Sequence, residues 1–293
     1  MLDNESLFDR RAVRRNRDRA SVNFAKFDYL ITAAAAMLVD RLEDIRRTFP
    51  VALDLGCHTG QVAAATSETG KIESLFQSDL SPFMAAKSGG LCFAADEEFL
   101  PVGDDSLDLV LSCLSLHWVN DLPGALIQIR RALKPDGLFL GSFLGGESLD
   151  ELRQALVAAE SEITGGVHPR VSPMADVRDG GALLQRAGFA MPVADTDLYT
   201  VSYENPLKLM RDLRGMGEQM ATSSRLKSFS RKDVLIRAAE FYGEIFGNEE
   251  SRVTATFEII TLTGWAPAPD QQQPLQRGSA EQSLGDFLNP DDV

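Results

Sequence analysis

Three aspartates and two glycines are the residues of this chain whose types and spacing point most directly to chemistry. Asp54, Asp79 and Asp96 each stand at the end of a short apolar run, and Gly56 and Gly60 follow the first run. Carboxylates at strand ends can accept hydrogen bonds from a nucleoside. Asp79 is placed to accept from ribose hydroxyls, and Asp96 from an adenine amino group. The glycines allow a tight turn, so that the backbone can approach a ligand. The pattern predicts an adenosine site, which four neighbours would also line: Cys57, Leu80, Glu97 and Ser112.

The glycine spacing argues against two phosphate-containing ligands. A dinucleotide site needs Gly-x-Gly-x-x-Gly, but here His58 stands two positions after Gly56, and the next glycine is Gly60. The Gly-x-x-x-x-Gly-Lys-Ser/Thr run of nucleoside triphosphate sites is absent from the sequence. An adenosine with an amino-acid tail and no phosphate fits better, with Asp54 as the acceptor for an ammonium group. Histidine tolerates a positive φ less well than glycine, so we expect strained or left-handed backbone at His58.

The candidate catalytic residues are His117, Trp118 and Glu218. His117 is a possible general base, and Trp118 a wall over a methyl group or a guanidinium, although both residues could instead pack at a strand-to-helix turn. Glu218 could grip a substrate arginine through paired hydrogen bonds, or lie on a solvated helix face. The three histidines form no His-x-Asp/Glu pair, so we expect no non-haem iron site and no other metal.

Apolar runs that alternate with helical segments must position these residues. Strands are expected at 51–56, 73–80, 91–96, 107–112 and 138–143, with helices beginning at Gln61 and Pro82 and another over 121–133. Such alternation predicts βαβ units and a parallel sheet with right-handed crossovers. The second half predicts helices at 147–163, 176–188, 205–218 and 231–247, and strands at 193–203 and 253–265. We expect these two strands to form an antiparallel pair at one sheet edge, and the helices to cover the site.

The chain divides into three expected parts. Residues 1–48 form a helical segment, predicted as helix over 5–48, and residues 49–265 form the α/β domain. Insertions at about 145–175 and 205–250 supply the helical cover. Residues 266–293 are rich in Pro, Gln, Asp and Ser, which predicts a disordered tail.

Composition limits the partners and the compartment. With 29 basic and 43 acidic residues the net charge is −14, which disfavours binding to nucleic acid. No apolar stretch reaches the ~18 residues of a membrane span. The three cysteines form no Cys-x-x-Cys pair, as expected for reduced thiols in a cytoplasm.

The strand-end acids and the glycine turn resemble the class I methyltransferase family. Asp54-x-Gly56-x-x-x-Gly60 resembles the glycine motif of that family, Asp79 its ribose acid and Asp96 its adenine acid, while His58 replaces a usual glycine. The resemblance implies a Rossmann-like α/β fold with a mostly parallel seven-stranded sheet and helices on both faces. It also implies S-adenosylmethionine as the cofactor.

A closer resemblance covers residues 5–265. The stretches 8–17, 114–153 and 172–189 are similar to the respiratory complex I assembly factors of mitochondria, and 114–153 is the most specific. That family is understood to hydroxylate an arginine of a complex I iron–sulfur subunit, which implies a protein substrate. It also implies a bacterial cytoplasm or, in a eukaryote, the mitochondrial matrix.

Two other functions stay open. The malonyl-acyl-carrier-protein methyltransferases of biotin synthesis are a more distant resemblance, mainly in the cofactor half, and imply O-methylation of a carboxyl or hydroxyl group. A non-catalytic assembly chaperone that keeps S-adenosylmethionine as a structural ligand is the third reading.

The N-terminal segment carries six arginines between residues 10 and 19. A helix this basic is either a solvated helix or a docking surface for an acidic partner. In the docking interpretation Arg14, Arg15 and Arg17 contact the partner and lie outside the cofactor site.

Overall fold

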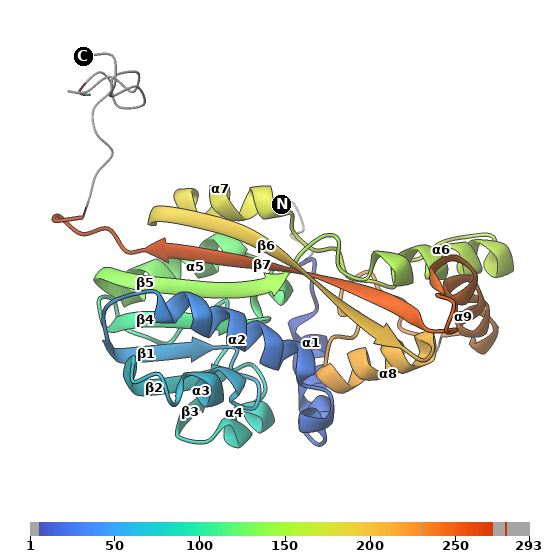
Figure 1. The fold of residues 1–293 in the computed structure, drawn as a ribbon, viewed down its shortest axis with the longest axis horizontal. Helices are drawn as coiled ribbons and strands as arrows, with labels where there is room; N and C mark the ends of the chain where they lie inside the picture. The colour runs from blue at the N-terminus through green and yellow to red at the C-terminus, as the bar shows by residue number, and fades with distance from the viewer. Residues whose placement is uncertain (1–5, 229, 272–278, 280–293) are drawn as a thin grey trace, which may run out of the picture.

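The computed structural model describes residues 6–228, 230–271 and 279, and its centre is a seven-stranded sheet in the order β3-β2-β1-β4-β5-β7-β6 (Figure 1). The first five strands pair in parallel, and β7 runs antiparallel to both β5 and β6. The predicted mostly parallel sheet with an antiparallel pair at one edge is confirmed. The strands are β1 Phe49–Leu55, β2 Ile72–Asp79, β3 Leu91–Ala94, β4 Leu107–Cys113, β5 Leu133–Leu144, β6 Ala190–Tyr203 and β7 Val253–Trp265.

Helices cover both faces of the sheet, as predicted. Alternate residues of a strand point to opposite faces, so Leu109 and Leu111 of β4 pack in one core cluster, with α2, while Val110 packs in the other, with α5 and α7. The helices are α1 Arg10–Ala20, α2 Tyr29–Glu43, α3 Gln61–Thr66, α4 Pro82–Ser88, α5 Leu122–Ala132, α6 Asp150–Thr164, α7 Val177–Ala187, α8 Pro206–Met216 and α9 Lys232–Phe246.

The single helix predicted over 5–48 is wrong, because the segment forms two helices with different surroundings. Helix α2 is largely apolar and packs on the sheet, whereas α1 is arginine-rich and lies across the carboxyl ends of the strands (Figure 1). Between them, residues 21–28 turn through the short 3-10 helix η1, Phe24–Lys26, which buries Phe24. The chain therefore changes direction in the segment that buries Phe24.

A helical cover lies beyond the carboxyl ends of the parallel strands, where α1, α6, α8 and α9 gather (Figure 1). Residues 7–9 pair with the segment after α8: the Asp9 N–H donates to the Ala221 carbonyl (2.8 Å), and the Ser223 N–H to the Leu7 carbonyl (2.9 Å). Helix α1 is therefore part of the helical cover, which the sequence predicted from the C-terminal half alone. The expected tail, 266–293, lies mostly outside the described residues.

Within the described ranges, no helix combines the length and the apolar character needed to cross a membrane.

Candidate active site

The three predicted acids meet at the carboxyl edge of the sheet. Asp54 lies in β1, Asp79 ends β2, and Asp96 follows β3; these strands are neighbours, so their carboxyl ends lie side by side. Asp54 and Asp79 are fully buried, and so is Glu97, the residue after Asp96. The hydroxyl of Ser115, in the loop after β4, donates to Glu97 Oε1 (2.6 Å), so this loop also contributes to the site.

The turn after β1 requires both of its glycines. Gly56 has φ +79°, and a Cβ there would lie 2.1 Å from the Ser115 Oγ. Gly60 has φ +94°, and its Cβ would lie 2.8 Å from the Ser88 carbonyl oxygen. Any side chain at either position would be strained and would collide with its neighbour.

His58, the departure from the glycine motif, has φ 49°, so the expected left-handed backbone is confirmed. Its imidazole stacks on Phe24 with ring centroids 5.6 Å apart, and Nε2 lies 3.1 Å from the Cys113 carbonyl oxygen. Burial, followed by Arg17, lowers the pKa of His58, so the ring is neutral. The side chain therefore packs in the interior under the turn.

Backbone N–H groups hold the two adenosine acids in place. Asp79 Oδ1 accepts from the N–H of Ser81 (2.7 Å), and Oδ2 accepts from the N–H of His58 (3.1 Å). Asp96 Oδ1 accepts from the N–H of Glu98 (3.0 Å). Both carboxylates are thus oriented by the chain that follows their strands.

Asp54 has no such support. Both of its carboxylate oxygens are buried, and neither has a hydrogen-bond partner. Burial, and then the nearby Asp79, raise the pKa of Asp54 to about 8. A buried acceptor without a donor is a position where a ligand can supply one.

Two arginines of α1 enter this site, and sequence reasoning missed both. The side chain of Arg17 is 1% exposed; its Nη1 lies 2.8 Å from Glu97 Oε1 and 3.3 Å from Asp79 Oδ2, and its Nη2 donates to Ser115 Oγ (2.8 Å). Arg10 bonds to Asp96 Oδ1 (2.6 Å) and also pairs with Glu97. The expectation that Arg17 faces a partner outside the cofactor site is therefore wrong.

The exposed arginines of α1 lie on its other face, as Arg14 and Arg15 show. The sequence did hold a signal for Arg17, because it stands four residues after Val13 and three before Ala20, on the stripe that α1 buries.

Charge pairing sets the ionisation of the cluster. Burial raises the pKa of Glu97, but Arg17 and then Arg10 outweigh it and hold that pKa well below its usual range. Glu97 is therefore a carboxylate between two guanidinium groups.

The three candidate catalytic residues also come together, from segments about 100 positions apart in the chain. Glu218 Oε2 accepts from both His117 Nε2 and Trp118 Nε1, each at 2.9 Å. Glu218 lies just beyond α8 with its side chain 8% exposed, so it is not on a solvated helix face. Burial raises the pKa of Glu218, but His117 and then Arg17 outweigh it and lower that pKa.

This arrangement fixes the imidazole of His117. If Nε2 carries the proton that is donated to Glu218, Nδ1 of a neutral ring is the acceptor. Nδ1 is buried and has no partner, as a base awaiting a substrate proton would be. Trp118 is buried beside it, with the Phe8 ring packed edge-on against the indole at 5.4 Å between centroids.

Comparisons with known proteins identify the fold and the family. Residues 53–141 match a family model described as a methyltransferase domain. Over 289 residues the chain is 45% identical to "Arginine-hydroxylase NDUFAF5, mitochondrial" of Danio rerio, a similarity that covers 96% of this chain and 89% of that protein. The chain belongs to the NDUFAF5 family.

More distant relatives share the fold. This NDUFAF5-family chain is 32% identical over 291 residues to a malonyl-[acyl-carrier protein] O-methyltransferase of Methylovorus sp., covering 92% and 95% of the two chains. The structure of phosphoethanolamine N-methyltransferase 2 of Haemonchus contortus with S-adenosyl-L-methionine superposes with a TM-score of 0.55 at 16% identity, over 87% of this chain and 60% of that one. S-adenosylmethionine is the cofactor of this enzyme fold.

The residues of the NDUFAF5-family site fit that cofactor. The unpartnered Asp54 carboxylate suits the ammonium group of the methionine end, and Asp79 and Asp96 present oriented acceptors for ribose and adenine. The glycine turn leaves the backbone free to approach the ligand. When bound, the cofactor supplies a sulfonium-activated methyl group and a positive charge.

The other predicted pocket residues lie at the same edge with smaller roles. The Ser112 hydroxyl donates to the Leu55 carbonyl (2.7 Å) and so ties β4 to β1. Cys57 is buried, and burial raises the pKa of its thiol. Leu80 packs against the Phe8–Trp118 contact. Across the residues that the structure describes, no group of three or more His, Cys, Asp or Glu side chains is placed to hold a metal ion.

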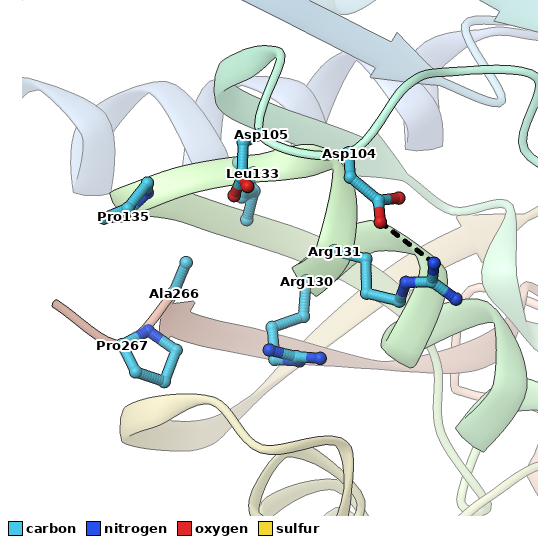
Figure 2. Close-up of a pocket in the computed structure, with 8 residues that line it drawn as sticks. All are labelled: Asp104, Asp105, Arg130, Arg131, Leu133, Pro135, Ala266 and Pro267. Atoms are coloured by element: carbon cyan, nitrogen blue, oxygen red, sulfur yellow. Dashed lines mark hydrogen bonds and ion pairs between the residues drawn. The ribbon is translucent and has the colours of Figure 1, made fainter.

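A cavity of about 340 Å³ lies away from this site, at the amino ends of β4 and β5 (Figure 2). Its wall includes the Arg131–Asp104 ion pair (2.9 Å), and it contains none of the predicted residues.

Proposed function

We propose that this protein hydroxylates an arginine side chain of a protein partner, at a site made by the S-adenosylmethionine pocket and the His117–Trp118–Glu218 cluster. The observation that carries the proposal is the 45% identity, over 96% of the chain, to a protein named an arginine hydroxylase. The site is compatible with it, because the buried Nδ1 of His117 has no partner and can accept a hydrogen bond from a guanidinium N–H beside the Trp118 ring.

The cluster assigns a role to each side chain. His117 Nδ1 accepts a hydrogen bond from an N–H of the substrate guanidinium, and Trp118 is the wall that limits how the planar group can turn. Glu218 is a positioning residue, since its Oε2 holds both rings. With dioxygen as oxidant, one oxygen atom enters a C–H bond of the arginine. Two electrons and two protons from an external reductant release the other oxygen atom as water.

The partner would meet the protein at the outer face of α1. Four arginines are exposed there on a chain of net charge −14: Arg11, Arg14, Arg15 and Arg19. Such a face orients an acidic surface during association. We propose the complex I iron–sulfur subunit as the partner, with an acidic surface on α1 and an arginine loop in the site.

Peptide mass spectrometry of that subunit tests the proposal. The subunit is purified from cells that contain the protein, cells that lack it, and cells in which it is restored. One arginine should carry one extra oxygen atom only where the protein is present. A subunit of identical mass in all three would overturn the proposal.

A methyl group on the subunit, or on an acyl-carrier substrate, would favour the second candidate. That candidate is an O-methyltransferase of the malonyl-acyl-carrier-protein type, and it rests on the 32% identity to the Methylovorus enzyme. The absence of a His-x-Asp/Glu iron pair from the sequence does not separate the two functions, but the added mass does.

A further inference from the structure

Helix α1 presents two arginines to the carboxylates that the cofactor needs. Arg10 and Arg17 are seven residues apart, so they lie on one face, about two turns and about 10 Å apart along the axis. Arg10 bonds to Asp96 and Arg17 to Asp79. One face of one helix therefore holds both the adenine acid and the ribose acid.

The arginines bond to the two carboxylates that the cofactor would use. Asp79 Oδ2 accepts from the His58 N–H (3.1 Å) and from Arg17 (3.3 Å), and Asp96 Oδ1 accepts from the Glu98 N–H (3.0 Å) and from Arg10 (2.6 Å). Each of these oxygens already has two donors, which is the number of its lone pairs. Asp79 is also fully buried with Arg17 against it, so the cofactor must compete with the guanidinium donors to reach these carboxylates.

The attachment of α1 to the rest of the protein suits a moving element. At its amino end, residues 7–9 pair with residues 221–223 through two backbone hydrogen bonds. Its apolar contacts there form a small cluster separate from the main cores: Phe8, Ala12, Val13, Trp118 and Ala221. At its carboxyl end the chain breaks at residues 21–28 before α2 packs on the sheet. Of α1 only Ala20 packs in the main core, and the other buried contacts of the helix are largely the polar ones of Asn16 and Arg17. A helix held mainly by polar contacts can open as a unit while the core stays folded.

We propose that α1 is a gate for the cofactor. It swings about residues 21–28, Arg10 leaves Asp96 and Arg17 leaves Asp79, and S-adenosylmethionine then binds to the released carboxylates. Opening precedes binding, and we expect opening to be the slower step, which limits the rate of cofactor entry at high cofactor concentration. The inference depends on the cofactor alone and is independent of the proposed arginine chemistry.

Stopped-flow fluorescence tests the gate. The sequence has two tryptophans, so Trp265→Phe leaves Trp118 alone, beneath α1, where its carbonyl oxygen accepts from Arg10 Nη1 (3.1 Å). With rising S-adenosylmethionine the observed rate should level off at the opening rate. Arg10→Met should raise that plateau about tenfold or more, because a closed state of this kind typically leaves about 0.1–10% open.

Arg14→Met is the matched control, because that side chain is 54% exposed and touches no residue of the site. It should leave the plateau unchanged. A rate that rises linearly with cofactor in the parent would overturn the gate. So would an Arg10→Met variant that binds more weakly at an unchanged association rate, since Arg10 would then be a cofactor ligand.

A covalent lock gives a second test that does not rely on fluorescence. Phe8 and Thr222 face each other as a bridge pair flanked by hydrogen bonds, the short-distance arrangement that accepts a disulfide. Phe8→Cys with Thr222→Cys, in a Cys92→Ser background that removes the exposed thiol, would fasten the amino end of α1. Oxidation should slow the association of radiolabelled S-adenosylmethionine about tenfold or more, and dithiothreitol should restore it. Equal rates in the two redox states of this one polypeptide would overturn the proposal.

Discussion

Binding of S-adenosylmethionine should release a proton from Asp54, and Asp54→Asn should abolish that release. The carboxyl group is buried without a hydrogen-bond donor, and burial with Asp79 raises its pKa to about 8. Below that pH it is neutral in the protein alone. The cofactor ammonium favours the carboxylate, so the proton leaves as the ligand binds.

The magnitude follows from the linkage between protons and binding. Below a pKa of about 8, each pH unit upward reduces the cost of ionising Asp54 by about 1.36 kcal/mol. Between about pH 5.5 and about pH 7 the affinity for S-adenosylmethionine should therefore rise about 30-fold, or about 2 kcal/mol. The range stops there because an α-amino group itself titrates near pH 7.7–8.0.

Titration calorimetry measures this effect directly. At pH 6.5, buffers of different ionisation enthalpy should give about one proton released per cofactor bound to the parent protein. Asp54→Asn keeps the size of the side chain but cannot ionise, so it should release none and lose most of the pH dependence. It also corrects for protons exchanged at other groups of the protein. Parent binding without proton release would refute the assignment of the ammonium group to Asp54.

Three further changes test other parts of the site. Glu218→Gln should lower modification about tenfold or more by releasing the base and the aromatic wall, with cofactor affinity unchanged by calorimetry. The double change Arg14→Ala with Arg15→Ala should slow association with the acidic partner and flatten the salt dependence of the association rate. Surface plasmon resonance measures both. An association rate equal to that of the parent at every salt concentration would contradict docking on α1. Gly56→Ala should destabilise the fold by about 1–3 kcal/mol in urea, because the new methyl group meets Ser115; an unchanged midpoint would contradict the close approach.

The sheet and the cofactor acids could be predicted because both follow from local patterns. Apolar runs separated by helical segments predict a parallel sheet, and the ends of neighbouring parallel strands must meet. Asp54, Asp79 and Asp96 are therefore close together in space because each stands at or near the end of one of three neighbouring strands. The left-handed backbone of His58 follows equally from its place in a glycine turn.

The partners of the arginines could not be predicted: helical spacing places Arg17 on the buried stripe of α1, but which acids it meets depends on tertiary packing. An arginine-rich helix predicts a solvated surface, and only the facing acids make burial of Arg17 favourable. The contact of Glu218 with His117 also depends on how two distant segments pack. The break between α1 and α2 has the same cause, since Phe24 is buried by tertiary packing that no local signal announces.

The most direct test ties the arginine modification to this site. The complex I iron–sulfur subunit is isolated from cells whose only copy of the protein is the parent, Asp54→Asn or Glu218→Gln, each at the same cellular level, and its peptides are weighed. An arginine that bears one added oxygen atom should be abundant with the parent and strongly depleted with both variants. The same oxygenated arginine at parent abundance in both variants would contradict the account.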